Sequence, residues 1–389
     1  MSNNFIAAIA TMIGVIIGAG ILGIPFVVAK AGFWLGISYI LGIGLLMLLV
    51  NLCLGEVALR TNAMHQLAGY AEKYLGVWGK RANAVSMVVG IYGALIGYIA
   101  GAGQVLYSLF PVNFVPQYGE RISSLLSNAG TFWALVFFIV GAIVLFFGIR
   151  IMKAAEIFTN AVKLLLFAVL LLIIFYSGLI QKWNFSGVYW YNWYLPYGVV
   201  FFAFLGFATL PEVREILKYD AKKVKKAIII GSLIPIVVYL LFAFAVVGVT
   251  GDDTTDVATI GLGKAIGPHA FWAGQLFALV ALSTAFIGLG FALKEMYVLD
   301  FNRSEAMAWL LTVIVPLAII LFLPQTFIGA LAITGAFAGG LQGILNIMMF
   351  YKAKKLGDRK PEYEIKLPRI VGNAICVLFA IGMIAAFLF

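Results

Sequence analysis

The sequence has few charged residues and few of the side chains that act as nucleophiles or bind metals. Of its 389 residues only 11% are charged and 63% are hydrophobic, whereas a soluble domain usually carries about 25% charged residues. The mean hydropathy is +1.07. This balance excludes an ordinary soluble domain and predicts an all-α protein that crosses a membrane several times.

Cysteine and histidine are almost absent, which excludes several kinds of chemistry. Cys53 and Cys376 lie far apart in apolar runs, so we expect two buried thiols and neither a disulfide nor a metal framework. The two histidines, His65 and His269, are isolated in the sequence. Without converging His, Asp, Ser or Cys groups, we predict neither an enzyme nor a bound cofactor or metal.

The net charge of +10 follows from topology and requires no nucleic-acid partner. Most lysines and arginines fall in loops on one side of the membrane if the N-terminus is cytoplasmic. We therefore predict a multi-pass protein of the cell membrane with an extracytoplasmic C-terminus. Eleven apolar runs are long enough to span the bilayer: 5–28, 33–58, 82–110, 131–149, 155–179, 195–216, 226–250, 269–299, 305–323, 326–351 and 369–388.

The first span is a poor continuous helix. Four glycines from Gly14 to Gly23 weaken it, and Pro25 removes a backbone donor. A broken helix at membrane depth exposes amide groups at one half-helix start and carbonyls at the other half-helix end. These groups suit a carboxylate and an ammonium. Close helix packing through Gly14-x-x-x-Gly18 is the competing interpretation.

The sixth span repeats the pattern. Gly206 precedes Pro211 by the same interval that separates Gly20 from Pro25. Each interrupted span opens a block of five spans, and because five is odd the second block has inverted topology. Paired interrupted spans in inverted halves point to a binding site at the membrane midplane. We predict one five-helix repeat over 1–180, its inverted copy over 181–352, and a loop with an eleventh helix over 353–389.

The stretch from Gly14 to Pro25, continuing as Ala29-Lys30-Ala31-Gly32-Phe33, resembles the first span of permeases in the amino acid–polyamine–organocation superfamily. It is most similar to the amino acid/auxin and aromatic amino acid branches. Phe202 to Gly206 with Glu212 resembles the sixth span, and Ala281 to Thr284 the eighth. The resemblance implies a leucine-transporter-like fold with discontinuous first and sixth helices.

By this resemblance, the amides of Gly18, Ala19 and Gly20 would bind a substrate carboxylate. The substrate ammonium would meet the carbonyls of Phe202, Ala203 and Leu205. The side-chain region would be lined by Ile13, Ile21, Phe204 and Phe207. Most glycines of the third span are expected to pack helices closely.

Lys163 lies about two turns inside its span, whereas the other charged residues of the spans lie near their inner ends; burial of its charge requires a partner or a function. Snorkelling to the cytoplasmic interface is one interpretation. The resemblance implies another: some family members bind sodium at positions matching Gly14, Ile17, Val280, Ser283 and Thr284, and others place a lysine ammonium there. Lys163 matches this lysine.

We therefore expect a secondary transporter of neutral, apolar or aromatic amino acids that works by alternating access. The expected coupling is sodium-independent and uses a proton carried by Lys163, because burial lowers the pKa of a lysine. Sodium symport through Ser283 and Thr284, and exchange or facilitated diffusion, remain the alternatives. A membrane sensor is disfavoured because both termini are short.

Overall fold

The computed structural model describes residues 3–111, 129–147, 150–299, 301–323 and 326–388. Throughout these ranges the regular secondary structure is helical, without a strand. Within the described residues, ten helices are long and apolar enough to cross a membrane, and the bent pair near the N-terminus, counted as one span, brings the number to eleven. The prediction of an all-α protein with eleven spans is confirmed.

The first span is broken where its glycines cluster. Helix α1 (Asn3–Ile16) ends before Gly18, whose backbone is extended at φ −96° and ψ −156°. A short 3₁₀ helix, η1 (Ala19–Gly23), and helix α2 (Ile24–Ala31) follow. The two halves meet at an angle of 44°. Pro25 lies in the first turn of α2, where its missing N–H costs no helical hydrogen bond.

The sixth span is broken in the same way. Helix α8 (Leu195–Ala203) ends at the break, and η4 (Phe207–Thr209) and α9 (Leu210–Ile216) follow it. Pro211 again occupies the first turn after the break. Both interruptions predicted from the Gly and Pro positions are therefore present.

The remaining spans are long helices, and one of them has an internal π-helical turn, η7. They are α3 (Phe33–Leu59), α4 (Leu67–Leu109), α6 (Ala129–Phe147), α7 (Arg150–Ser177), α10 (Val224–Thr250), α12 (Pro268–Leu299), α13 (Glu305–Phe322), α14 (Phe327–Thr334) with η7 (Gly335–Gly339) and α15 (Gly340–Leu356), and α16 (Arg369–Leu388). Short helices occupy the connections: η2 (Lys182–Phe185), η3 (Trp190–Asn192), η5 (Ala221–Lys223), η6 (Gly251–Asp253) and α11 (Ala258–Ile266).

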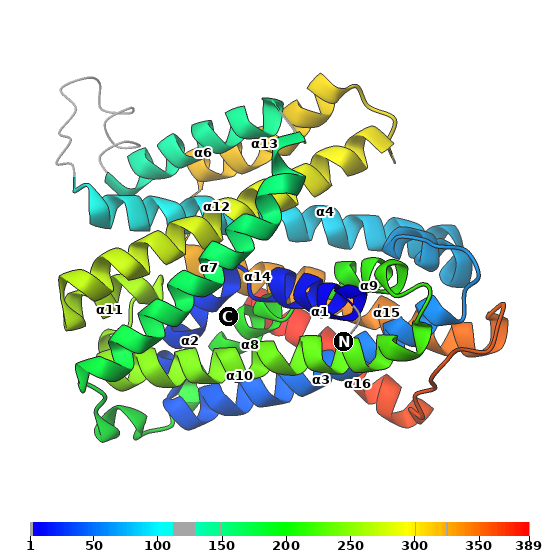
Figure 1. Ribbon diagram of the computed structural model, residues 1–389, viewed down its shortest axis with the longest axis horizontal. Coiled ribbons are helices and arrows are strands. Elements are labelled where there is room, and N and C mark those ends of the chain that lie inside the picture. Colours follow the sequence, from blue (N-terminus) through cyan, green and yellow to red (C-terminus); the bar gives the residue numbers. More distant parts are fainter. Residues whose placement is uncertain (1–2, 112–128, 148–149, 300, 324–325, 389) are drawn as a thin grey trace.

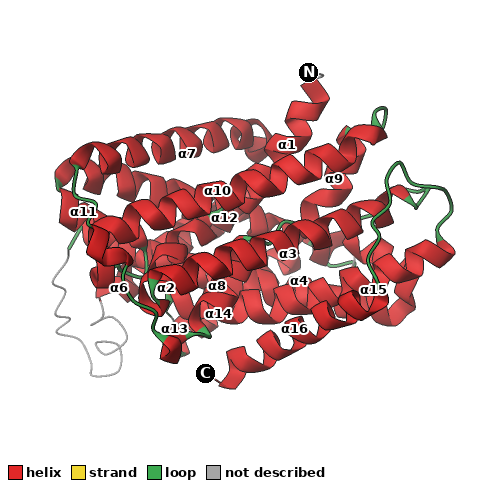
Figure 2. Cartoon of the chain, turned by 90° about the horizontal axis from the view of Figure 1, so that it is seen from below, coloured by secondary structure: helices red, strands yellow, loops and turns green. Residues whose placement is uncertain are grey.

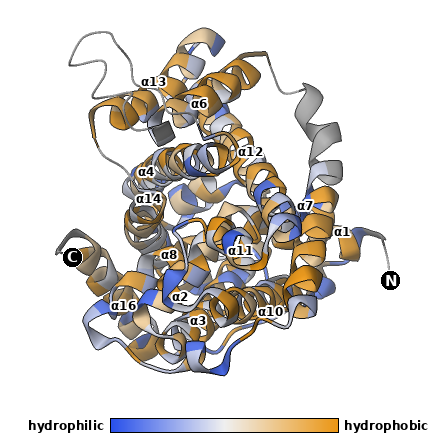
Figure 3. Cartoon of the chain, turned by 90° about the vertical axis from the view of Figure 1, so that its left-hand side faces the viewer, coloured by the Kyte–Doolittle hydropathy of each residue, from blue (hydrophilic) through white to orange (hydrophobic). Residues whose placement is uncertain are grey.

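The long helices run along the longest axis of the molecule (Figure 1). Seen end-on, α2 and α8 lie inside a ring made by α3, α4, α7, α10, α12 and α14, while α6, α13 and α16 lie outside it (Figure 3). The broken spans are therefore enclosed by continuous helices. Apolar residues dominate the ribbons in this view, as a bilayer environment requires.

Helix α4 consists of two helices that meet at Gly76, whose φ of 77° is not helical. A short helix from Leu67 comes first, and the long third span follows Gly76. Further along α4, three glycines leave one face of the helix without side chains, and residues of α14 pack against this face. The contacts are Gly93 with Thr334, Gly97 with Leu331, and Gly101 with Phe327. The expectation that most glycines of this span pack helices is confirmed.

Connections 60–66, 217–223 and 357–368 lie at one end of the bundle, which we call the basic end. Figure 2 shows the last of these as the long loop that leads from α15 to α16. Arg60 pairs with Glu56 one turn earlier, with 2.8 Å between Nε and Oε1. Arg214 of α9 donates to the carbonyls of Thr61 and Ala63 and to the Tyr70 hydroxyl. These bonds tie the second broken span to the 60–66 connection.

Asp358 joins the 357–368 connection to the helices of the basic end. The Lys73 ammonium and the Asn62 amide both donate to Asp358 and lower the pKa of its carboxyl. These two contacts hold the 357–368 connection at the basic end.

Both cysteines are free, as predicted, but only Cys53 is buried. Cys376 is half-buried, so the expectation of a second buried thiol is wrong.

The packing of α8 against α14 generates a stability prediction. A Cβ atom at Gly198 would lie 2.2 Å from the Ala332 carbonyl oxygen, which belongs to rigid backbone. We expect Gly198→Ala to force the helices apart and to destabilise the protein by about 1–3 kcal/mol. Thermal unfolding in detergent measures the effect. Gly42→Ala is the matched control, since a Cβ there meets nothing within 4 Å; equal melting of the two variants would contradict the packing described.

Candidate binding site

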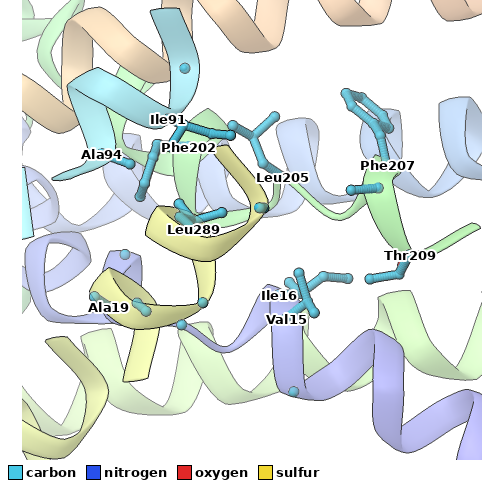
Figure 4. A pocket seen from close by; sticks show the side chains of 18 of the residues that line it. Val15, Ile16, Ala19, Ile91, Ala94, Phe202, Leu205, Phe207, Thr209 and Leu289 are labelled. Atoms are coloured by element: carbon cyan, nitrogen blue, oxygen red, sulfur yellow. The ribbon is translucent and has the colours of Figure 1, made fainter. Parts of the chain in front are cut away.

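A cavity of about 690 Å³ lies where the two broken spans meet. Figure 4 shows Val15, Ile16 and Ala19 on one wall and Phe202, Leu205 and Phe207 on another. Helix α4 adds Ile91 and Ala94, and α12 adds Leu289. The size lies within the range of small-molecule sites, and such sites are mostly apolar with a few fixed polar groups.

The polar groups at the first break are backbone atoms. Gly18, Ala19 and Gly20, whose amides were expected to meet a substrate carboxylate, all line the cavity. The Gly18 amide already donates to the Ile16 carbonyl at 2.8 Å, so Ala19 and Gly20 remain as the candidates. Helix η1 begins at Ala19, and no side chain caps its start. The first amides of a helix lack intrahelical acceptors and carry the positive end of the helix dipole. This wall therefore suits a negatively charged group.

At the second break, the end of α8 contributes carbonyl groups. Phe202, Ala203, Leu205 and Phe207 line the cavity. The Phe202 carbonyl accepts the Leu205 amide at 3.1 Å, which leaves it one further lone pair. Orphan carbonyls at a helix end attract a positive group. The two breaks thus present opposite electrostatic character to one cavity.

Of the four residues expected from the sequence to contact the ligand side chain, only one lines the cavity. Phe207 lines the cavity, but Ile21 is fully buried and is not part of the described wall. Ile13 and Phe204 likewise do not line it. Phe204 packs on Tyr239 with 4.9 Å between ring centroids. For Ile21 the reason is local: η1 has three residues per turn, and Ala19 and Gly20 lie on its cavity side while Ile21 does not.

Lys163 of α7 reaches the first break. It is buried with 3% of its surface exposed, and its Nζ lies 3.2 Å from the Gly14 carbonyl oxygen. Lys163, Gly14 and the neighbouring Asn160 all line the cavity. The ammonium thus lies at the carbonyl end of α1, where the helix dipole favours a cation.

Of the residues expected to bind sodium in the alternative mechanism, several do not line the cavity. Thr284 lines the cavity, and its hydroxyl donates to the Val280 carbonyl of its own helix at 2.8 Å. Ser283, Val280 and Ile17 are not part of the described wall. The Thr284 hydroxyl and the Val280 oxygen are therefore already paired with each other in this conformation.

One tyrosine lines the cavity and a second lies behind the two breaks, and sequence reasoning missed both. Tyr98 of α4 lines the cavity with its ring edge toward Phe202, 6.2 Å between centroids. No partner of its hydroxyl is seen among the described residues. Tyr239 of α10 places its hydroxyl 2.5 Å from the Ile16 carbonyl oxygen and 2.8 Å from that of Ala203. A lone Tyr in an apolar run carries no sequence signal for either role.

The sequence profile of the tryptophan/tyrosine permease family matches residues 1–388. The chain belongs to this family. Tyrosine-specific transport system 1 of Haemophilus influenzae is 26% identical to the permease over 381 residues, 92% of this chain and 90% of the relative. Glutamine transporter 2 of Aliivibrio fischeri is 25% identical over 318 residues, 78% of this chain and 77% of the relative.

A crystal structure of MhsT in complex with L-phenylalanine superposes on the permease with a TM-score of 0.66 and 16% identity. It covers 100% of this chain and 98% of that one. At this identity the likeness shows the fold alone, and it confirms the predicted leucine-transporter-like architecture. The family and its relatives are transporters and not enzymes, as predicted.

The cavity of the permease extends toward the basic end. Its wall includes Leu67, Glu212 and Glu295, which lie where α4 begins, in α9, and near the last turn of α12. Lys163, Glu212 and Glu295 are the charged residues of the described wall. Lys163 lies beside the first break, Glu212 lies in the first turn of α9 after the second break, and Glu295 lies further toward the basic end.

At the opposite end of the permease, polar contacts join the end of α2 to two connections. Lys30 donates to the Asp252 carbonyl at 3.0 Å, and Asn192 donates to the Lys30 carbonyl at 2.6 Å. Burial raises the pKa of Asp256, an effect that its hydrogen bond with Gln104 and the charge of Lys30 oppose. The described cavity wall contains no residue of these connections.

Proposed function

We propose that this permease carries neutral amino acids with apolar or aromatic side chains across the membrane by alternating access. The observation that carries the proposal is the meeting of two half-helix ends of opposite polarity in one cavity. The amides of Ala19 and Gly20 suit a carboxylate, and the carbonyls at the end of α8 suit an ammonium. The Tyr98 hydroxyl adds a donor for the carboxylate.

The walls beside the breaks favour a large uncharged side chain. Ile91, Ala94 and Phe202 form apolar surface. Gly288 of α12 also lines the cavity, and a Cβ atom there would meet nothing within 4 Å. The tyrosine-specific relative and the family description support an aromatic substrate. The glutamine-transporting relative is the reason to test polar amino acids as well.

We propose that the basic end faces the cytoplasm, with the N-terminus cytoplasmic and the C-terminus outside. The distribution of Lys and Arg supports this orientation. The cavity then opens inward. The division into repeats 1–180 and 181–352, followed by 353–389, stays part of the proposal, and the matching breaks of α1–α2 and α8–α9 support it.

We further propose sodium-independent, proton-coupled transport through Lys163. Its ammonium donates to a first-span carbonyl that a coupling cation would otherwise use. The buried position supports reversible loss of the proton, because burial disfavours the charged form. Sodium symport through Ser283 and Thr284, and exchange or facilitated diffusion without an ion, are the competing functions.

Substrate class is tested first by binding. The purified permease is heated with each of the twenty amino acids, and we expect the largest rise in melting temperature with tyrosine, tryptophan or phenylalanine. Radiolabelled uptake into liposomes then follows the best ligand. If no amino acid shifts the melting temperature and none is taken up, the proposed function is wrong.

Coupling is tested by imposing sodium and pH gradients separately. We expect uptake to respond to the pH gradient alone, and Lys163→Gln to abolish that response because a neutral amide carries no exchangeable charge. Lys264→Gln, an exposed lysine far from the cavity wall, is the matched control. Uptake that needs sodium and ignores pH would favour the sodium alternative; an unchanged pH response in Lys163→Gln would exclude the lysine as the proton carrier.

Side-chain size is tested at Gly288. We expect Gly288→Leu to fill empty space in the cavity and to weaken binding of tryptophan by at least about tenfold, with progressively smaller losses for tyrosine and leucine. Gly42→Leu adds the same atoms to the exposed face of α3 and should change nothing. Losses that do not depend on ligand size would show that the side chain lies elsewhere.

A further inference from the structure

Tyr239 is a buried polar residue that the proposed mechanism does not use. It belongs to α10, has 0% of its surface exposed, and is not part of the described cavity wall. Its ring is held against Phe204 of the second break. Its hydroxyl lies within hydrogen-bond distance of two carbonyl oxygens, those of Ile16 and Ala203. These residues are the last of α1 and of α8.

Two helix C-termini that converge on one point repel each other, because each carries a partial negative charge. Positive charge between them removes this repulsion, and in broken-helix transporters unwound carbonyls and half-helix ends coordinate the coupling ion. In this permease the group between the two ends is a phenolic O–H. The Ile16 carbonyl also accepts the Gly18 amide at 2.8 Å, so the ends are satisfied by donors of the chain itself.

A hydroxyl has one proton and can donate to only one of the two carbonyls at a time. A monovalent cation at the same point would be attracted to both oxygens at once. The Tyr239 hydroxyl thus attracts the two carbonyl oxygens less strongly than a cation would, but it is covalently attached to the chain and cannot leave. Lys163 is likewise a tethered donor at the end of α1, since its ammonium donates to the carbonyl of Gly14, two residues before Ile16.

We propose that the Tyr239 hydroxyl takes the place of a monovalent cation between the two breaks and positions them for substrate binding without an ion. Tyr239 is a positioning residue, because it acts through the backbone of Ile16 and Ala203 and does not line the cavity. The inference rests on the proposed function in one respect: the two breaks must form the amino acid site.

The test removes the hydroxyl and asks whether a cation can replace it. Binding of the best amino acid ligand is measured by thermal shift in cation-free N-methylglucamine buffer and with added Li⁺, Na⁺ or K⁺. In the unmodified permease we expect the same affinity in all four buffers. In Tyr239→Phe we expect affinity in cation-free buffer to fall by about tenfold or more, and at least one cation to restore most of it.

Tyr197→Phe is the matched control, because it removes a buried phenolic oxygen that has no partner among the described residues. Its affinity should stay unchanged and insensitive to cations. Tyr239→Asn is the second variant if Tyr239→Phe does not fold; its shorter side chain leaves room for a cation, and we expect the same cation-dependent binding.

Three results would overturn the inference: unchanged affinity of Tyr239→Phe in cation-free buffer, lost affinity that none of the cations restores, or a sodium requirement in the unmodified permease. A purely structural role of Tyr239 would give the second result. Failure of the proposed function is distinct, because then the unmodified permease binds no amino acid in any buffer.

Discussion

The structure depends on satisfying main-chain polar groups where two helices are interrupted inside a bilayer. In hydrocarbon each unpaired amide or carbonyl is costly, so a break survives only where partners are supplied. Here the partners are specific. Lys163 donates to Gly14, Tyr239 lies against Ile16 and Ala203, and the Gly18 amide turns back to Ile16. The carbonyls of Gly14, Ile16 and Ala203 therefore have donors within the chain, whereas no side chain caps the start of η1 at the cavity wall.

Continuous helices around the breaks make this possible. Glycines of α4 bring α14 close, and Gly198 brings α8 to the backbone of α14. Close packing of this kind replaces the hydrophobic effect as the driving force between helices in lipid. It also encloses the broken spans, and Arg214 of α9 ties the second of them to the 60–66 connection.

Much of this architecture could be predicted from the sequence, because the signals are local. Apolar runs fix the spans, and glycine followed by proline weakens a helix wherever it occurs, so both breaks were predictable. A lysine in an apolar run demands a partner, which singled out Lys163. The cavity-facing side of η1 was not predictable: Ile21 points into the core because the 3₁₀ geometry, and not the residue type, sets its direction. Tyr98 and Tyr239 were missed since a phenol fits either a core or a site, and only the tertiary arrangement decides.

The chemical identity of the groups at the breaks constrains what can be coupled to transport. A diffusible sodium ion is released to the other side of the membrane in each cycle, and its gradient therefore does work. A tethered ammonium or phenol cannot leave, so the only species it can exchange is a proton. Lys163 lines the cavity together with Glu212 and Glu295, and this cavity extends toward the basic end. Tyr239 lies outside that cavity wall, and its hydroxyl lies between two backbone carbonyls. Under the coupling proposed above, the lysine is therefore the donor that exchanges a proton through the cavity, and the tyrosine is the donor that keeps the two breaks in position.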